Sequence, residues 1–205
     1  MLKISEVHAG YGATPILFGV SLDVREGEAV ALLGRNGMGK TTLMKAAMGF
    51  LKPWRGAIEL DGRELGGLPP HEIARLGVGF VPENRRVFPG LTVRENLELG
   101  LSAVPKRSAA LRDKRLDEVF THFPRLRERI DQPGKTLSGG EQQMLAIARE
   151  RGLTLLLIEH DMSVVMGISD RIAVLHFGEK IAEGPPEAIR QDPRVIDAYL
   201  GGAED

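Results

Sequence analysis

The sequence predicts an α/β fold with a buried parallel sheet, an antiparallel β portion and an inserted helical subdomain. The first observation is the apolar run Ala29–Leu33, whose length and continuity are typical of a strand buried on both faces. The second is a central stretch, about 88–149, with the apolar spacing of helices. The third is the return of strand patterns after residue 152. With 205 residues, we expect one domain over 1–205.

The N-terminal part reads as short strands joined by turns. Arg25-Glu26-Gly27-Glu28 separates two of the strands, and Pro82 stops the last. Asp61-Gly62 is a strong signal for a tight turn, because both residues tolerate the left-handed conformation. The expected strands are Ile16–Val24, Ala29–Leu33, Gly56–Leu60 and Gly77–Val81.

The helical insert opens with a capping-box spacing. Thr92 and Glu95 stand three residues apart, just before a run of leucines. Arg112–Arg127 is rich in charge and carries apolar residues at helical spacing, and Gln142–Arg149 is expected to form the last helix of the insert. The apolar positions of the middle helix are Leu116, Val119, Phe120 and Phe123.

The C-terminal part alternates strands with short closing helices. We expect strands at Leu153–Ile158, Arg171–Phe177 and Lys180–Glu183, and helices at Pro186–Arg190 and Val195–Leu200.

Composition excludes several function classes. A net charge of -1 gives no global attraction to nucleic acid, and we expect no nucleic-acid partner. The absence of cysteine rules out disulfides, zinc-thiolate sites and thiol catalysis. No apolar run reaches the roughly 18 residues of a spanning helix, so we expect any membrane association to depend on partner subunits.

The most specific motif is a phosphate-binding loop of the form G-x-x-x-x-G-K-[ST]. It follows the predicted strand Ala29–Leu33 and precedes a helical run, Thr42–Met48, which is the context that such a loop requires. Glycines let successive N–H groups face an anion, and the helix N-terminus adds partial positive charge. Lys40 is expected to reach the β- and γ-phosphates of ATP, and Thr41 to bind Mg²⁺. The nucleotide-binding candidates here are Gly34, Asn36, Gly37, Gly39, Lys40, Thr41 and Thr42.

A second glycine-rich motif opens the helix that ends the insert. Ser138 and two glycines expose backbone donors at a helix start, which makes another anion-binding site. The motif reads Leu137-Ser138-Gly139-Gly140-Glu141-Gln142-Gln143 and resembles the LSGGQ signature of ABC ATPases. The resemblance covers nearly the whole chain.

The resemblance implies a head-to-tail dimer with two ATP sites. In that family the signature of one subunit completes the site of the other, so the residues expected to act in trans are Ser138, Gly139, Gly140 and Gln142. Tyr11 stands where the family places an aromatic residue that stacks on adenine, although a lone tyrosine is more often a packing residue. His160 stands at the family's switch histidine, which contacts the γ-phosphate.

One motif departs from the family pattern. Val81-Pro82-Glu83 occupies the Q-loop, where glutamine is usual, and a carboxylate at Glu83 can bind Mg²⁺ directly or through water. We therefore expect Glu83 and His160 to be catalytic, with Thr41 and Glu83 as metal ligands. The segment around Val81–Leu97 and the ending Ile181–Pro185 with Val195–Leu200 look like the subgroup that serves branched-chain amino-acid importers.

A Walker B strand, which the family needs for its Mg²⁺-holding Asp and catalytic Glu, has no counterpart. Arg149 leads through Glu150 almost directly to Leu153–His160, where about 30 to 40 residues of one strand-helix unit are expected. Glu159 could stand in for the Asp, but the segment after it better matches the switch histidine. We expect the intact protein to contain this unit between Arg149 and Glu150, so that Arg149 ends the signature helix. Loss of a strand from inside the sheet would cost several kcal/mol or more.

The phosphate loop predicts a subunit that binds ATP and Mg²⁺. The resemblance implies an ATPase that drives uptake of a small solute, with branched-chain amino acids as the expected solute. The resemblance implies a second ABC ATPase subunit, identical or related, and transmembrane permease subunits as partners. It also implies a cytoplasmic location on the inner face of the cell membrane. Two alternatives remain: a nucleotide-binding module without hydrolysis, if the Walker B segment is truly absent, and an ABC ATPase not tied to transport.

Overall fold

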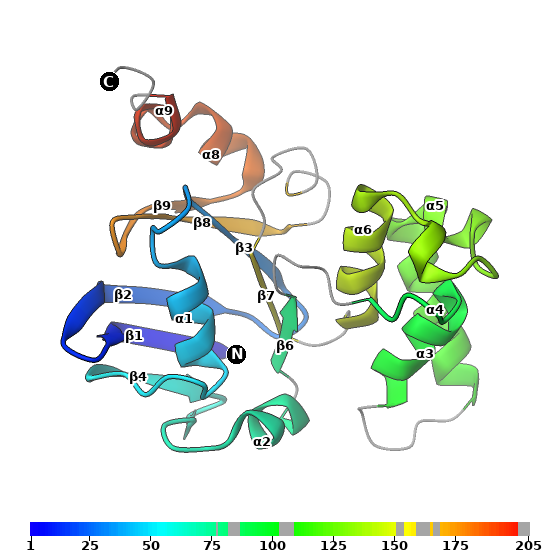
Figure 1. The fold of residues 1–205 in the computed structure, drawn as a ribbon, viewed down its shortest axis with the longest axis horizontal. Coiled ribbons are helices and arrows are strands. Elements are labelled where there is room, and N and C mark those ends of the chain that lie inside the picture. Colours follow the sequence, from blue (N-terminus) through cyan, green and yellow to red (C-terminus); the bar gives the residue numbers. More distant parts are fainter. Residues whose placement is uncertain are drawn as a thin grey trace. The chain divides into compact units, whose positions relative to one another are not determined.

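The structure, a computed structural model, describes residues 1–76, 78–81, 87–102, 109–150, 154–158, 165 and 169–200. The chain divides into two compact units (Figure 1). Unit 1 contains residues 1–80 and 153–205, and unit 2 contains residues 81–152. The helical insert expected at about 88–149 falls inside unit 2.

Unit 1 contains an antiparallel sheet in the order β2-β1-β4-β5. Strands β1 and β2 pair along most of their length, and β1 also pairs with β4. The predicted tight turn joins β4 to β5, and its two residues have φ values of 50° at Asp61 and 79° at Gly62. The strands are β1 (Leu2–Tyr11), β2 (Thr14–Val24), β4 (Arg55–Leu60) and β5 (Arg63–Glu64).

A second sheet of unit 1 carries the phosphate-binding loop. Its order is β6-β7-β3-β8-β9, with β3 parallel to both neighbours and β9 antiparallel to β8. All five residues of β3 are buried, as the continuous apolar run predicts. The strands are β3 (Ala29–Leu33), β6 (Val78–Val81), β7 (Thr154–Ile158), β8 (Arg171–His176) and β9 (Glu179–Gly184).

The core of unit 1 lies between the two sheets and the helix that follows the phosphate loop. Side chains from β1, β3 and β7 meet the apolar face of α1 in one cluster, which includes Ile4, Leu32, Leu43 and Leu156. The helices among the described residues of the unit are short. They are α1 (Lys40–Ala47), α2 (Pro70–Arg75), α8 (Pro186–Gln191) and α9 (Pro193–Leu200).

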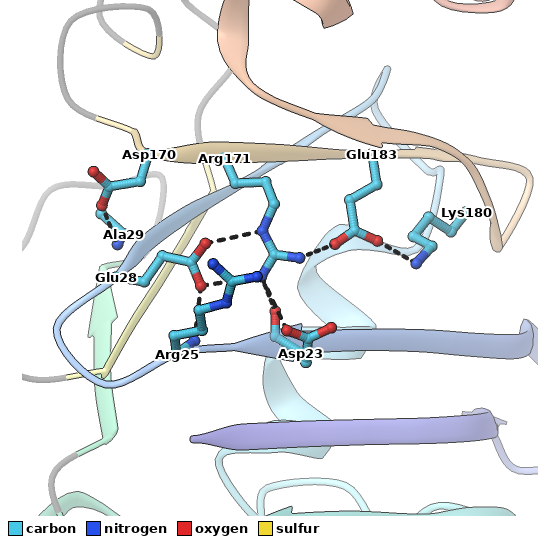
Figure 2. A network of polar contacts seen from close by, with 8 residues as sticks. All are labelled: Asp23, Arg25, Glu28, Ala29, Asp170, Arg171, Lys180 and Glu183. Carbon is cyan, nitrogen blue, oxygen red and sulfur yellow. Dashed lines mark hydrogen bonds and ion pairs between the residues drawn. The ribbon is translucent and has the colours of Figure 1, made fainter.

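The two sheets are also joined by an ionic cluster around Arg171 at the start of β8 (Figure 2). Its guanidinium contacts Glu28 at 2.9 and 3.0 Å and Asp23 of β2 at 3.3 Å, and it pairs with Glu183 of β9. Burial lowers the pKa of Arg171, but the hydrogen bond to Glu28 and the three negative charges outweigh that effect and raise it. Lys180 pairs with the other oxygen of Glu183. The cluster therefore links β2 to the strands of the second sheet.

Unit 2 is helical, and two of its helices differ from the sequence-based expectation. The single helix expected over Arg112–Arg127 is divided at Phe123, because Pro124 cannot continue the hydrogen-bond pattern of α4. The signature helix α6 runs from Gly139 to Glu150, so the expectation that it ends at Arg149 is wrong. The helices are α3 (Val93–Ser102), α4 (Ala109–His122), α5 (Pro124–Glu128), α6 (Gly139–Glu150) and the 3-10 turn η1 (Gly134–Thr136).

Candidate functional site

The phosphate-binding loop runs from the end of β3 to the start of α1. Gly34, Gly37 and Gly39 have φ values of 147°, 84° and 98°, which other residues rarely adopt. A side chain at Gly34 would place its Cβ 2.3 Å from the carbonyl oxygen of Leu175 in β8. The loop is thus packed so closely against the neighbouring strand that glycine is required there.

Lys40 begins α1 and is folded over the loop. Its side chain is only 6% exposed, and its Nζ donates hydrogen bonds to the carbonyl oxygens of Gly34 at 2.6 Å and Arg35 at 3.0 Å. These contacts hold the ammonium group beside the backbone of the loop. A phosphate that enters the loop can replace these carbonyl oxygens as the hydrogen-bond acceptor of the Lys40 Nζ. The loop is therefore suited to bind an anion.

The other predicted loop residues differ in exposure. Asn36 and Gly37 are exposed at the tip of the loop, and Thr41 is exposed in the first turn of α1. Thr42, the next residue of α1, is buried and only 5% exposed. The helix begins after Gly39, which has no side chain to cap its N–H groups. Donors of this helix start and the Thr41 hydroxyl are therefore suited to a phosphate with a bound metal ion.

Tyr11, at the end of β1, lies beside α1. A hydrogen bond with Thr42 is the main cause that lowers the pKa of Tyr11; burial acts in the opposite direction, and the hydrogen bond and charge of Lys45 lower it further. The Lys45 Nζ lies 5.2 Å from the centre of the tyrosine ring. The ring is 45% exposed, which leaves area for a stacked base.

Sequence reasoning missed Lys45. A signal for it existed, because Lys45 follows Thr41 by four residues and so shares a face of α1 with it. The sequence does not, however, indicate that β1 brings Tyr11 to that face. The structure thus places Tyr11, Thr42 and Lys45 together near the phosphate loop.

The signature segment opens α6 in unit 2. The N–H of Ser138 donates to Glu141 at 2.8 Å, and the N–H of Glu141 donates to the Ser138 hydroxyl at 3.3 Å, which is a capping box. The Ser138 N–H is the main cause that lowers the pKa of Glu141, which also forms an ion pair with Arg129 at 2.6 Å. Ser138 and Gly140 are exposed and Gly139 is half-buried.

Gln142 has a role inside unit 2 that the sequence did not indicate. Its Nε2 donates hydrogen bonds to the carbonyl oxygens of Gly134 and Leu137, both at 3.2 Å. This side chain therefore supports the segment that leads into the signature. Its predicted contact with a partner's nucleotide stays a prediction.

Glu83 and His160, the predicted catalytic residues, lie outside the described residues, and their roles stay predictions. The strand before His160 is described: β7 pairs in parallel with β3, and Ile158 faces Leu32 in the register. The carboxyl ends of these two strands therefore meet at one edge of the sheet, where the phosphate loop begins. Within the described residues, no group of three or more His, Cys, Asp or Glu side chains is arranged to hold a metal ion.

Comparison with known proteins gives two family matches. The family described as "ABC transporter" matches residues 17–153, and the family described as "Branched-chain amino acid ATP-binding cassette transporter" matches residues 179–205. The high-affinity branched-chain amino acid transport ATP-binding protein BraG of Pseudomonas aeruginosa is 36% identical, with 98% of this chain and all of BraG covered. That comparison extends over 236 positions and covers 98% of the 205 residues of this chain, so it includes positions that have no counterpart here.

Solved structures of ABC transporter ATP-binding subunits have a fold similar to that of this chain. The structure described as "ATP binding subunit of ABC transporter" has a TM-score of 0.70 and 26% identity, with 98% of each chain covered. The dimeric structure of MJ0796, a bacterial ABC transporter cassette, has a TM-score of 0.68 and 26% identity, covering 91% of this chain and 99% of that one. Among the residues that the structure describes, no helix has both the length and the apolar character needed to cross a bilayer.

Proposed function

This chain belongs to the ABC transporter family, and from that premise we propose that it is the ATP-binding subunit of an importer for branched-chain amino acids. The phosphate loop with the buried Lys40 at its base is the observation that supports nucleotide binding. The match of residues 179–205 to a branched-chain amino-acid family, together with the identity to BraG, supports the substrate class.

ATP binds with its phosphates in the loop 34–39 and its base on Tyr11. Lys40 exchanges one of its carbonyl contacts for the β- and γ-phosphate oxygens, and the first N–H groups of α1 donate to the same anion. The exposed hydroxyl of Thr41 would hold Mg²⁺, which neutralises phosphate charge when bound. Glu83 would be a further ligand.

Replacement of Tyr11 by alanine is expected to lower affinity for ATP and GTP together, by a factor of about five or about 1 kcal/mol, because stacking on a ring is nearly blind to base identity. Nucleotide titration measures the two affinities. Tyr11→Phe is the matched control: it keeps the ring while it removes the hydroxyl that Thr42 contacts, so its affinity should stay close to that of the parent. A Tyr11→Ala variant that unfolds more easily but binds both nucleotides normally would identify Tyr11 as a packing residue.

Two subunits would assemble head to tail around two nucleotides. The exposed Ser138 and Gly140 at the start of α6 are suited to the phosphate of a nucleotide on a second chain. A structurally similar cassette, MJ0796, forms a dimer. The second chain would be another copy of this protein or a related ATPase.

We expect ATP to promote dimers when Mg²⁺ is withheld to block hydrolysis, because nucleotide then bridges the phosphate loop of one chain and the signature of the other. Size-exclusion chromatography with light scattering, with and without ATP, measures the assembly. The Ser138→Arg variant fills the exposed signature with a bulky cation and should stay monomeric. If the parent chain itself stayed monomeric at high concentration with saturating ATP, the two-site dimer would have to be abandoned.

Hydrolysis would follow by in-line attack of water on the γ-phosphate, which yields ADP and phosphate. His160 and Glu83 are the residues of this chain that we assign to that step. The strand that precedes His160 in the sequence, β7, pairs with β3, which leads into the phosphate loop. A catalytic carboxylate of Walker B type has no counterpart in this sequence. The helix α6 continues through Arg149 and Glu150, and the strand-helix unit expected between them stays a prediction.

Two measurements separate this function from its alternatives. Single-turnover hydrolysis of ATP by the purified chain distinguishes an ATPase from a module that only binds nucleotide. Co-purification with membrane permease subunits distinguishes an importer from an ABC ATPase not tied to transport. We place the protein on the cytoplasmic side of the membrane, attached through those permease subunits.

A further inference from the structure

Asn96, in the first turn of α3, is a polar side chain with no solvent exposure. Its Oδ1 accepts a hydrogen bond from the Phe88 N–H at 2.8 Å. Its Nδ2 lies within hydrogen-bond distance of the carbonyl oxygens of Phe88 at 3.1 Å, Leu91 at 3.2 Å and Thr92 at 3.0 Å. A buried amide whose donors and acceptor are all used fixes one arrangement of the backbone around it.

The backbone that Asn96 holds is the loop 88–92. Phe88 is half exposed, so burial of the Phe88 side chain does not fix this end of the loop. The loop also accepts hydrogen bonds from the next segment: the Gly134 N–H donates to Leu91 at 2.8 Å, and the Lys135 N–H donates to Pro89 at 3.0 Å. A Cβ at Gly134 would lie 3.0 Å from the Phe88 carbonyl oxygen, so the two segments are in close contact.

The same segment leads directly into the signature. The Gly134 carbonyl accepts hydrogen bonds from the Leu137 N–H at 3.3 Å and from the Gln142 side chain at 3.2 Å. A continuous set of contacts therefore runs from Asn96 through the loop 88–92 and Gly134 to both sides of Ser138. All of it lies within unit 2.

We propose that Asn96 is a positioning residue for the signature: it holds the loop 88–92, on which Gly134 rests, and so sets the conformation in which Ser138–Gly140 meet a nucleotide on a second chain. This inference rests on the proposed function for the trans contact. A side chain that served only to fill space in the subdomain would be apolar, since a buried amide adds a desolvation cost.

The test uses Asn96→Asp, which keeps the shape but replaces the NH2 donor with an oxygen that faces three carbonyl oxygens. Gln132→Glu is the matched control, because it makes the same amide-to-acid change at an exposed position of unit 2. In the free monomer, the hydrogen-exchange rates of the backbone amides of 134–142 should rise at least tenfold in Asn96→Asp. The same rates should not rise in Gln132→Glu. Exchange in the phosphate loop of unit 1 should not change.

ATP-driven assembly without Mg²⁺ gives the second readout. Asn96→Asp should bind ATP as the parent does but need at least ten times more protein to form dimers. A mixture of Asn96→Asp with Lys40→Ala should recover dimers, because the mixed pair has one site that combines an intact phosphate loop with an intact signature. A merely destabilised variant would not be rescued in this way.

The outcomes separate the role of Asn96 from the proposed nucleotide site between two chains. Normal dimers of Asn96→Asp, no rescue in the mixture, or unchanged exchange at 134–142 would each overturn the role of Asn96. If the parent chain formed no dimers with ATP, the proposed trans site would fail instead, and the hydrogen-exchange result would still decide whether Asn96 positions the signature segment.

Discussion

Replacement of Lys40 by alanine is expected to weaken ATP binding by at least tenfold, which corresponds to about 1.4 kcal/mol or more. Lys40 is the buried cation of the phosphate loop, and its Nζ already lies against the loop carbonyls of Gly34 and Arg35. Within the loop, Arg35 is the other cation, but its side chain is exposed and is not held in the cradle. A charge-assisted contact to phosphate is therefore lost without replacement.

Titration of ATP against the purified variant measures the loss. Lys52→Ala, which removes an exposed lysine of the same unit, is the control and should bind ATP normally. Lys40→Met retains the apolar stem of the side chain and removes only the charge, so a similar loss in that variant would assign the effect to the ammonium group rather than to packing. Unchanged ATP affinity in both Lys40 variants would exclude Lys40 from the site.

Replacement of Arg171 by methionine is expected to destabilise unit 1 by about 3 kcal/mol, the loss measured when one partner of a largely buried ion pair is removed. Arg171 is 18% exposed, Glu28 12% and Glu183 20%, so water compensates the remaining charges only in part. Without the guanidinium, Asp23 and Glu28 would lose their cationic partner, and Glu183 would keep only its contact with Lys180 (Figure 2).

Denaturant unfolding followed by circular dichroism measures this change as a shift in the free energy of unfolding. Arg194→Met is the matched control, because the Arg194–Asp192 pair lies in the same unit with the Arg194 side chain 68% exposed, and such surface pairs contribute little to stability. Arg171→Lys should fall between the parent and the methionine variant, since an ammonium group cannot contact three carboxylates with the fork geometry of a guanidinium. Equal stability of Arg171→Met and the parent would show that the cluster does not hold the two sheets together.

The sequence by itself determined features that depend on local chemistry. The strand Ala29–Leu33 has the predicted bounds, because a short continuous apolar run next to a glycine-rich loop has few other solutions. Asp61 and Gly62 form the predicted turn, because both adopt positive φ. The capping box of Thr92 and Glu95 is present as the spacing predicts, with the Thr92 N–H bonded to Glu95 at 2.8 Å.

Local chemistry also explains where prediction from the sequence failed. Helical spacing alone extended one helix across Phe123, although Pro124 at the start of α5 separates it from α4. The predicted end of the signature helix at Arg149 is one residue early, because the next residue, Glu150, is not a helix-stopping residue such as glycine. Both errors concern the ends of helices, where continuing the helix and ending it differ by little free energy.

Contacts between distant positions were decided only by the tertiary structure. Asp23 and Glu28 form one cluster with Arg171 and Glu183 although the two pairs are more than 140 residues apart in the chain, and no local pattern marks them as partners. Lys45 reaches Tyr11 because β1 ends beside α1. Asn96 is buried because the loop 88–92 and Gly134 close over it, whereas its place after a capping box would equally suit an exposed residue. In each case the residue's role depends on which strand or loop packs against it, and that is fixed by burial of the whole core rather than by its own neighbours in sequence.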